Sequence, residues 1–382
     1  MENKEGIKYM TKQKIALVCD WLTGVGGAEK VILAVHRMYP DAPIYTSQYR
    51  PKTIDWFKSA DVRTGWLNYV PAGLKRFIPF LRQFYFSRLD LSDYDVVISI
   101  TGAEAKAVKT GPNTLHVSYM HAPIQYYWTL YDQYIENPGF GVLNPIARWG
   151  LKLLVGPLRK ADYKSAQGPD VVVSNSTYIQ EEIKKYYDRD SLVVWPNVDT
   201  ESIAKLAKKS KQTEKSQFII YGRQVSWKRM EIAIQAAIMT KNNLLVIGDG
   251  PEHNSLVTLA DDSKYITFLP RYNGIGEIIE HIAASRAYIF PSIEPFGIAP
   301  VESLAAGTPV IGLRKGGALD IIEPGVNGLF FDEQTPGSLA KAMEKFAKLK
   351  FDSQAVMASA DKFSEAQFAK KMHKIIQDHS RK

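Results

Sequence analysis

The feature that most restricts the fold of this chain is a repeated alternation of short apolar runs with helical patterns. The first series of apolar runs comprises residues 14–19, 95–100, 115–119, 170–174 and 191–195. Apolar runs of this length are typical of strands that are buried on both faces of a parallel sheet. A helical pattern such as residues 29–39 provides a cover for one of those faces.

The alternation restarts after residues 205–215, a lysine-rich stretch with few large apolar side chains that we interpret as leading into a second domain. The second series comprises residues 218–221, 244–247, 266–269, 287–290 and 310–312, with helical patterns at 230–239 and 337–349. With 382 residues, the chain is longer than one hydrophobic core usually organises. The sequence therefore predicts an α/β fold of two doubly wound, Rossmann-like domains that face a central cleft.

We expect the N-terminal domain to span residues 1–197 and the second domain residues 198–365. The remaining segment, residues 366–382, is a basic helix that can pack back on the first domain. In doubly wound sheets, ligands bind beyond the carboxyl ends of the strands. The search for a site therefore concentrates on the loops that follow the apolar runs.

Composition restricts the compartment and the partners. A single cysteine excludes an intramolecular disulfide and a multi-cysteine metal site. The first 14 residues lack the apolar segment of a signal peptide, and no uncharged run approaches the roughly 18 residues of a membrane span. A net charge of +8 favours a phosphorylated ligand or an anionic membrane surface, and no nucleic-acid-binding motif is present. We expect a cytoplasmic protein that is soluble or peripheral on the inner face of the cell membrane.

In each predicted domain, the loop after the first strand carries candidate ligand-binding residues. This loop is rich in glycine in the first domain and basic in the second. Gly26 and Gly27 precede the first helix, where glycine allows a close ligand approach and the helix N-terminus attracts anions. The spacing differs from the G-x-G-x-x-G motif of dinucleotide-binding enzymes, and a tight strand-to-helix turn is the structural alternative. In the second domain, Arg223 and Lys228 are cations that suit the two phosphates of a nucleotide diphosphate. The alternative is that Lys228 and the adjacent Arg229 are solvated residues at the start of a helix.

The segment from Ser292 to Glu302 contains two glutamates eight residues apart. Pro300 suits a first helical turn and Gly307 suits a helix end, which places Glu294 in a loop and Glu302 on the following helix. If both were helical they would lie about 12 Å apart along the axis, a spacing that suits two points on one extended ligand. The alternative is that Glu302 is merely solvated.

His121 follows another predicted strand, and its imidazole can donate a hydrogen bond to a sugar hydroxyl or a carbonyl. As a single histidine it could equally be structural. The sequence contains no G-x-S-x-G elbow for a serine hydrolase. It also contains no H-E-x-x-H motif or aspartate cluster, so we expect no metal site and no cofactor.

Taken together, these motifs resemble the family 4 retaining glycosyltransferases, which have the GT-B fold. The resemblance covers residues 14–365 in order and at the spacing of the family. It includes the glycine turn, the Arg223 and Lys228 pair, the E-x7-E signature of Glu294 and Glu302, and a later glycine pair, Gly316 and Gly317.

The resemblance implies a role for each matching residue. Arg223 and Lys228 stabilise the departing diphosphate in place of a metal ion, and a phosphate oxygen of the leaving group deprotonates the acceptor. Glu294 binds donor-sugar hydroxyls, and His121 holds the donor sugar from the other domain, so that domain closure completes the site. Glu302 binds ribose hydroxyls, and the remaining donor-binding residues are Gly26, Gly27, Phe296, Gly297, Ile298, Gly316 and Gly317.

A narrower match runs from Tyr119 to Trp128 and is similar to a subset of the family that mostly transfers mannose from GDP-mannose. The subset commonly has threonine where Ala122 stands and arginine where Gln125 stands. The resemblance implies a hexosyltransferase that acts on a glycan or lipid-linked acceptor in the synthesis of cell-envelope polysaccharide or glycolipid. The alternatives are a transferase that uses UDP-sugars, a sugar-nucleotide 2-epimerase of the same fold, and a non-catalytic binding subunit.

Residues 73–88 alternate cations with aromatic and aliphatic side chains, a composition typical of membrane-surface elements. The cations assigned to the acceptor and membrane side are Lys75, Arg76 and Arg82. Pro79 predicts a short helix with a bent continuation. The alternative is that the aromatic side chains belong to the core of the first domain.

Overall fold

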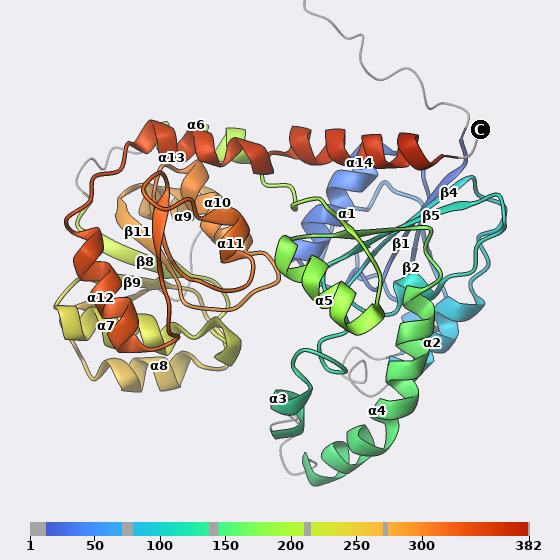
Figure 1. Ribbon diagram of the computed structural model, residues 1–382, viewed down its shortest axis with the longest axis horizontal. Coiled ribbons are helices and arrows are strands. Elements are labelled where there is room, and N and C mark those ends of the chain that lie inside the picture. The colour runs from blue at the N-terminus through green and yellow to red at the C-terminus, as the bar shows by residue number, and fades with distance from the viewer. Residues whose placement is uncertain (1–12, 71–78, 137–143, 210–214, 270–273, 381–382) are drawn as a thin grey trace, which may run out of the picture. The chain divides into compact units, whose positions relative to one another are not determined.

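The computed structural model describes residues 13–70, 79–136, 144–209, 215–269 and 274–380. The chain divides into two compact units (Figure 1). Unit 1 comprises residues 1–175, 179–194 and 369–382, and unit 2 comprises residues 176–178 and 195–368. Each unit is a parallel sheet with helices packed on its faces, which confirms the predicted α/β architecture of two Rossmann-like domains.

The sheet of unit 1 has seven strands in the order β3-β2-β1-β4-β5-β6-β7, and all the pairs are parallel. Every residue of β1 and β4 is buried, including Ser99 and Thr101 of β4, as expected for strands covered on both faces. The strands are β1 (Ile15–Cys19), β2 (Ile44–Thr46), β3 (Val62–Thr64), β4 (Val96–Thr101), β5 (Leu115–Met120), β6 (Val171–Ser174) and β7 (Leu192–Val193).

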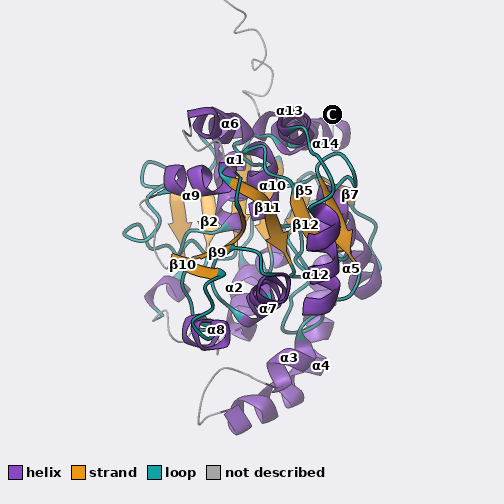
Figure 2. Ribbon diagram, turned by 90° about the vertical axis from the view of Figure 1, so that its left-hand side faces the viewer, coloured by secondary structure: helices purple, strands orange, loops and turns teal. Residues whose placement is uncertain are grey.

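The helices of unit 1 include one that is much longer than the others. Helix α4 (Asn144–Ala166) has 23 residues, and with α3 (Tyr131–Glu136) it extends beyond the sheet, as Figures 1 and 2 both show. The other helices are α1 (Gly27–Met38), α2 (Pro79–Arg88), most of α5 (Thr177–Tyr187) and the final part of α14 (Glu365–His379). Helix α2 begins at Pro79, where proline is tolerated because it supplies no backbone N–H.

The sheet of unit 2 has six parallel strands in the order β10-β9-β8-β11-β12-β13. The strands are β8 (Gln217–Tyr221), β9 (Leu244–Ile247), β10 (Ile266–Leu269), β11 (Ser285–Phe290), β12 (Val310–Leu313) and β13 (Gly328–Phe331). The helices are α6 (Thr200–Lys209), α7 (Met230–Thr240), α8 (His253–Ala260), α9 (Ile275–Ala283), α10 (Ile298–Ala305), α11 (Ala318–Ile321), α12 (Pro336–Phe346) and α13 (Ser353–Ser359).

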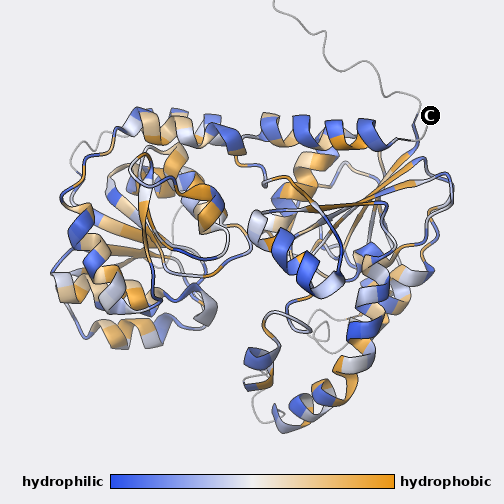
Figure 3. Ribbon diagram, viewed as in Figure 1, coloured by the Kyte–Doolittle hydropathy of each residue, from blue (hydrophilic) through white to orange (hydrophobic). Residues whose placement is uncertain are grey.

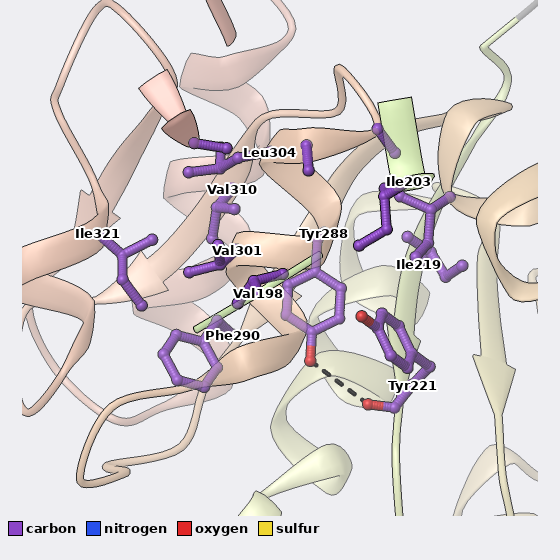
Figure 4. Close-up of a cluster of buried hydrophobic side chains, with 14 of the residues drawn as sticks. Val198, Ile203, Ile219, Tyr221, Tyr288, Phe290, Val301, Leu304, Val310 and Ile321 are labelled. Atoms are coloured by element: carbon purple, nitrogen blue, oxygen red, sulfur yellow. Dashed lines mark hydrogen bonds between the residues drawn. The ribbon is translucent and has the colours of Figure 1, made fainter. Parts of the chain in front are cut away.

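Alternate residues of each strand of unit 2 enter different hydrophobic cores. Ile219 and Tyr221 of β8 pack in a cluster with residues of α6, α9 and α10, part of which Figure 4 shows. Phe218 and Ile220 pack in a second cluster with residues of α7 and α12. Because successive side chains of a strand point to opposite faces, helices must cover both faces of this sheet.

The expected strands are present, but three further strands did not stand out in the sequence. Strands β2 and β3 have three residues each, and β13 begins with a glycine. The interpretation of residues 205–215 as a lysine-rich lead into the second domain was also incomplete. Residues 205–209 belong to α6, a helix whose Ile203 and Ala207 are buried in the core of unit 2. Residues 210–214 lie outside the described residues.

Across the described residues, no helix combines the length and the apolar character needed to cross a membrane.

Candidate functional site

The loops after β8 and β11 bring a lysine and a glutamate into contact within unit 2. Lys228 ends a short 3-10 helix (Ser226–Lys228), and Glu294 lies between β11 and α10. The Lys228 Nζ lies 2.6 Å from the Glu294 Oε1, and the two side chains are 21% and 16% exposed. Because β8 and β11 are neighbours in a parallel sheet, the loops at their carboxyl ends lie side by side. The structure thus places two of the predicted site residues together at the expected edge.

A third residue fixes the Glu294 carboxylate. The buried Ser292 donates from its hydroxyl to the same Oε1 at 2.7 Å. Among the residues that the structure describes, no hydrogen bond reaches the other oxygen, Oε2. One oxygen of Glu294 is therefore held by the protein, while the second makes no hydrogen bond within the described residues. Ser292 was not singled out from the sequence, although a polar residue directly after a strand is the signal that could have found it.

Arg223 lies two residues after β8 and differs from Lys228 in its environment. Its side chain is exposed, and the described part of the chain contains no ion pair for it. Gly222, which precedes it, has a φ of +139°, a conformation that favours glycine. The loop therefore presents one solvated cation and one cation held by a carboxylate.

Glu302 is buried rather than solvated, since only 6% of it is exposed. Its Oε2 accepts a hydrogen bond of 2.6 Å from the hydroxyl of Tyr221, the last residue of β8. The same hydroxyl lies 3.0 Å from the backbone oxygen of Ala299. The ring of Tyr221 packs edge-on against Tyr288, as Figure 4 shows. Tyr221 thus orients the carboxylate, and we did not identify it from the sequence because its run reads simply as a buried strand.

The glycine pair at 316–317 supports the loop that carries Glu294. The Gly317 N–H donates to the Glu294 backbone oxygen at 2.9 Å. A Cβ at Gly317 would lie 2.0 Å from the Phe296 oxygen, so only glycine fits at this position. Gly316 has a φ of +64°, and a Cβ there would lie 2.8 Å from the Glu294 oxygen. The two glycines are therefore needed for the close approach of two loops.

Two of the predicted donor-binding residues contribute no free side chain. Phe296 is 3% exposed, and its ring lies in the hydrophobic core with its centroid 5.5 Å from that of Phe363. Ile298 packs against the same core. The core therefore encloses the Phe296 ring, which leaves the backbone of this residue as the part that can face a ligand. Gly297, between them, has a φ of +111° and is the N-cap of α10, so this segment can offer its backbone.

In unit 1, Gly26 is the N-cap of α1, and Gly27 is the first residue of that helix. The Gly26 backbone is extended, so its conformation does not itself require glycine. A Cβ at Gly26 would lie 2.9 Å from the Glu29 Oε2, a contact that the flexible glutamate end could relieve. The pair therefore lies at the N-terminus of α1, the position that the sequence predicts for it.

His121 directly follows β5. Its side chain keeps some exposed surface, but the Nε2 atom is buried and has no hydrogen-bond partner among the described residues. Burial lowers the pKa of His121 to about 4, so the imidazole is neutral at physiological pH. A neutral imidazole whose Nε2 lacks a partner can exchange one hydrogen bond with a polar ligand.

The structure overturns one of the three predicted membrane cations. Arg82 is 6% exposed, its Nε lies 2.7 Å from the Glu104 Oε2, and its Nη2 donates to the Tyr126 hydroxyl at 3.0 Å. Burial raises the pKa of Glu104, and the Arg82 charge opposes that shift. An arginine enclosed in this way cannot reach a lipid headgroup. Lys75 and Arg76 lie outside the described residues.

A second buried ion pair holds α4 in unit 1. The Lys106 Nζ lies 2.6 Å from the Asp162 Oδ1, and the two side chains are 2% and 1% exposed. The Asp162 Oδ2 accepts hydrogen bonds of 2.7 Å from the Trp128 Nε1 and the Tyr187 hydroxyl. Trp128 belongs to the motif that resembles mannosyltransferases, and here it has a packing role. The carboxylate thus joins three elements of unit 1.

In the described part of the chain, no group of three or more histidine, cysteine or acidic side chains is arranged to hold a metal ion.

Comparisons with known proteins bear on the family and on the fold. Residues 202–368, which lie entirely within unit 2, match the family described as glycosyl transferases group 1. The fold of the whole chain is similar to that of Anabaena HepE, solved in complex with UDP and glucose. The TM-score is 0.64 at 18% identity, and the match covers 96% of this chain and 99% of the other.

Two curated relatives match shorter segments. A GDP-mannose-dependent alpha-mannosyltransferase of Corynebacterium glutamicum is 34% identical over 112 residues, 29% of this chain and 26% of the relative. The human alpha-1,3/1,6-mannosyltransferase ALG2 is 30% identical over 131 residues, 33% of this chain and 31% of the relative. The matched segments therefore span less than a third of the length of either relative. Residues 202–368, which carry the lysine–glutamate pair and the buried Glu302, match the glycosyl transferases group 1 family, and the chain has the GT-B fold.

Proposed function

We propose that this protein is a retaining glycosyltransferase that moves a hexose from a nucleotide sugar to a glycan or lipid-linked acceptor without a metal ion. The observation that carries the proposal is the contact between Lys228 and Glu294 at the carboxyl ends of β8 and β11. A lysine and a carboxylate at this edge suit the two parts of one donor, since the diphosphate is anionic and the sugar carries hydroxyl groups.

The cations support departure of the diphosphate. The bond between the anomeric carbon and the diphosphate oxygen breaks, while the acceptor oxygen bonds to the same face of that carbon. Lys228 and the exposed Arg223 stabilise the charge that develops on the leaving group. The acceptor proton passes to a phosphate oxygen of the leaving group, so the reaction needs no protein base and is balanced in atoms and charge.

The carboxylates bind the neutral parts of the donor. The Oε2 of Glu294 accepts hydrogen bonds from sugar hydroxyls, while Lys228 and Ser292 hold its Oε1. Glu302, oriented by Tyr221, accepts hydrogen bonds from the ribose. His121, neutral and with an unpartnered Nε2 within the described residues, donates to or accepts from the donor sugar.

The donor that we propose is GDP-mannose, and the product belongs to cell-envelope polysaccharide or glycolipid synthesis. Two relatives named as mannosyltransferases support mannose, one of them GDP-mannose-dependent. UDP-sugars are the alternative, because the HepE structure was solved with UDP and glucose. A 2-epimerase reaction on the donor alone is a further alternative, which product analysis separates from transfer or hydrolysis.

We expect GDP to raise the melting temperature more than UDP or ADP, and GDP-mannose to be consumed in the presence of EDTA. A ligand at 100 times its Kd stabilises a fold by about 2.7 kcal/mol, enough for a measurable shift. Differential scanning fluorimetry and chromatography of the nucleotide products measure the two effects. A shift with UDP alone would replace the proposed donor, and a strict requirement for Mg²⁺ or Mn²⁺ would contradict the metal-free mechanism. Formation of a new sugar nucleotide from donor alone would indicate an epimerase.

We expect Glu302→Ala to raise the KM for the donor about 10- to 100-fold with little change in kcat. The rise in KM reflects the loss of hydrogen bonds between the donor and a charged group. Ribose binding contributes equally to the ground and transition states, so turnover at saturating donor is preserved. In this variant the Tyr221 hydroxyl keeps the Ala299 oxygen as an acceptor. Steady-state kinetics measure both constants, with Glu344→Ala on the exposed face of α12 as the control. A large fall in kcat would remove Glu302 from the ribose role.

A further inference from the structure

Helix α4 has an exposed apolar stripe at its N-terminal end. Ile146, Trp149 and Leu153 are 68%, 68% and 60% exposed. At about 100° per residue, the three side chains lie within roughly 60° of one another around the helix axis. Soluble proteins rarely leave large apolar side chains grouped in this way, and such groups mark interaction surfaces. We call these three residues the α4 stripe.

The inner face of α4 is fully engaged, so the stripe is not the result of a loosely attached helix. Arg159 donates to the Tyr127 backbone oxygen at 2.6 Å, and its guanidinium lies 4.7 Å from the centre of the Tyr131 ring. Asp162 is held in the buried ion pair with Lys106. Arg148 donates to the backbone oxygen of Ile135 at 2.7 Å. These contacts fix the rotation of the helix and leave the stripe facing outward.

The charges of α4 match an anionic partner. Lys160 and Lys164 are exposed and continue the line of the α4 stripe, because they fall within the same roughly 60° sector at about 100° per residue. Lys152 is also exposed beside it. The one acidic residue of α4, Asp162, is buried. The exposed surface of α4 therefore carries cations and apolar groups but no carboxylate.

The neighbouring helix α3 does carry exposed acids, Asp132 and Glu136. Arg148, which binds the backbone of α3, lies about 200° around the helix from Ile146, and the acids thus approach α4 from the side opposite the α4 stripe. Figures 1 and 2 show that this end of α4 extends beyond the sheet of its unit, and Figure 3 shows hydrophobic segments along the helix.

We infer that the α4 stripe inserts into the surface of an anionic lipid bilayer, with Lys160 and Lys164 at the level of the phosphates. Ile146 and Leu153 are about 10 Å apart along the axis, and Lys160 follows about 10 Å further on. An interfacial element buries its apolar groups about 5–10 Å into the headgroup boundary, which a tilted α4 provides. Tryptophan at this position suits the interface, where its ring has one apolar and one polar side. The inference concerns a surface and does not depend on the proposed reaction.

The test is co-sedimentation of the full chain with vesicles of phosphatidylcholine, with and without phosphatidylglycerol. We expect the wild type to bind the anionic vesicles and to be released as salt shortens the range of the attraction. The variant Trp149→Ser/Leu153→Ser is expected to bind at least tenfold more weakly, since it loses two large apolar groups. The variant Lys160→Glu/Lys164→Glu is expected to bind roughly tenfold more weakly to anionic vesicles only.

The matched control is Met239→Ser/Val257→Ser on α7 and α8 of unit 2, which removes two apolar side chains that are 60% and 42% exposed. It is expected to bind vesicles like the wild type. Equal binding of the wild type and the α4 stripe variant would overturn the inference, as would the absence of binding at low salt. Sedimentation velocity identifies the competing occupant: a concentration-dependent dimer that the α4 stripe variant abolishes, without vesicle binding, would assign the surface to a second copy. Turnover of donor in solution tests the reaction separately.

Discussion

Lys228→Ala is expected to lower kcat by about 10²- to 10³-fold, the usual effect of removing one preorganised contact to developing negative charge. The substitution also leaves the Glu294 carboxylate without the cation that lies 2.6 Å from its Oε1. An unpaired carboxylate repels the donor diphosphate, so donor binding weakens as well. Donor-saturation kinetics measure both effects, with product nucleotide as the readout.

Three further variants make this result specific. Arg223→Ala is expected to lower kcat to a similar extent, because we propose that its exposed guanidinium stabilises the same leaving group. Lys228→Arg keeps the charge and should retain part of the activity, while Lys345→Ala on the exposed side of α12 should change nothing. A rate near that of the wild type for either alanine variant would exclude that residue from the diphosphate site.

Asp162→Ala is expected to destabilise unit 1 by about 3–5 kcal/mol, because removing one partner of a buried ion pair leaves the other charge uncompensated. Lys106 would lose its carboxylate, and Trp128 and Tyr187 would lose an acceptor at 2.7 Å. Hydrogen exchange of the unit 1 strands measures the effect locally, which matters because a protein of two units need not unfold in one step.

A double substitution separates charge from packing at this position. Lys106→Met/Asp162→Leu should recover the part of the stability that the unpaired Lys106 charge costs, because apolar residues of similar volume leave no buried charge, while Trp128 and Tyr187 still lack their acceptor. The control is Glu201→Ala, which breaks an exposed pair with Lys205 and should change stability by less than about 0.5 kcal/mol. If Asp162→Ala behaved like that control, the buried pair would not be what anchors α4.

Local sequence patterns are sufficient where burial is decided by a short run of residues. The runs at Ile15–Cys19 and at residues 218–221 predict strands because a fully apolar segment of that length has no exposed face to offer water. Gly307 and Pro300 likewise indicate the limits of α10 from backbone chemistry alone. The site residues at the strand ends follow from the same logic, since a parallel sheet gathers its carboxyl ends at one edge.

Short or weakly apolar elements could not be predicted from local sequence, because contacts with the rest of the fold stabilise them. Strand β3 is three residues long and partly exposed, so its composition does not predict a strand. Its parallel pairing with β2 stabilises the extended conformation. The lysine-rich residues 205–209 are helical because Ile203 and Ala207 of the same helix find a core to pack against. Tertiary packing decides such segments because local preferences are small compared with burial.

What the sequence by itself determined about this protein is the two α/β units and the chemistry available at the ends of their strands. Only the tertiary structure decided which charged and aromatic side chains face water. Arg82 is enclosed by Glu104 and Tyr126, Phe296 is enclosed by the core, and Trp149 is left exposed. The physical reason is that the exposure of a side chain depends on residues distant in the chain. A local pattern of residue types does not indicate which distant residues will contact each other.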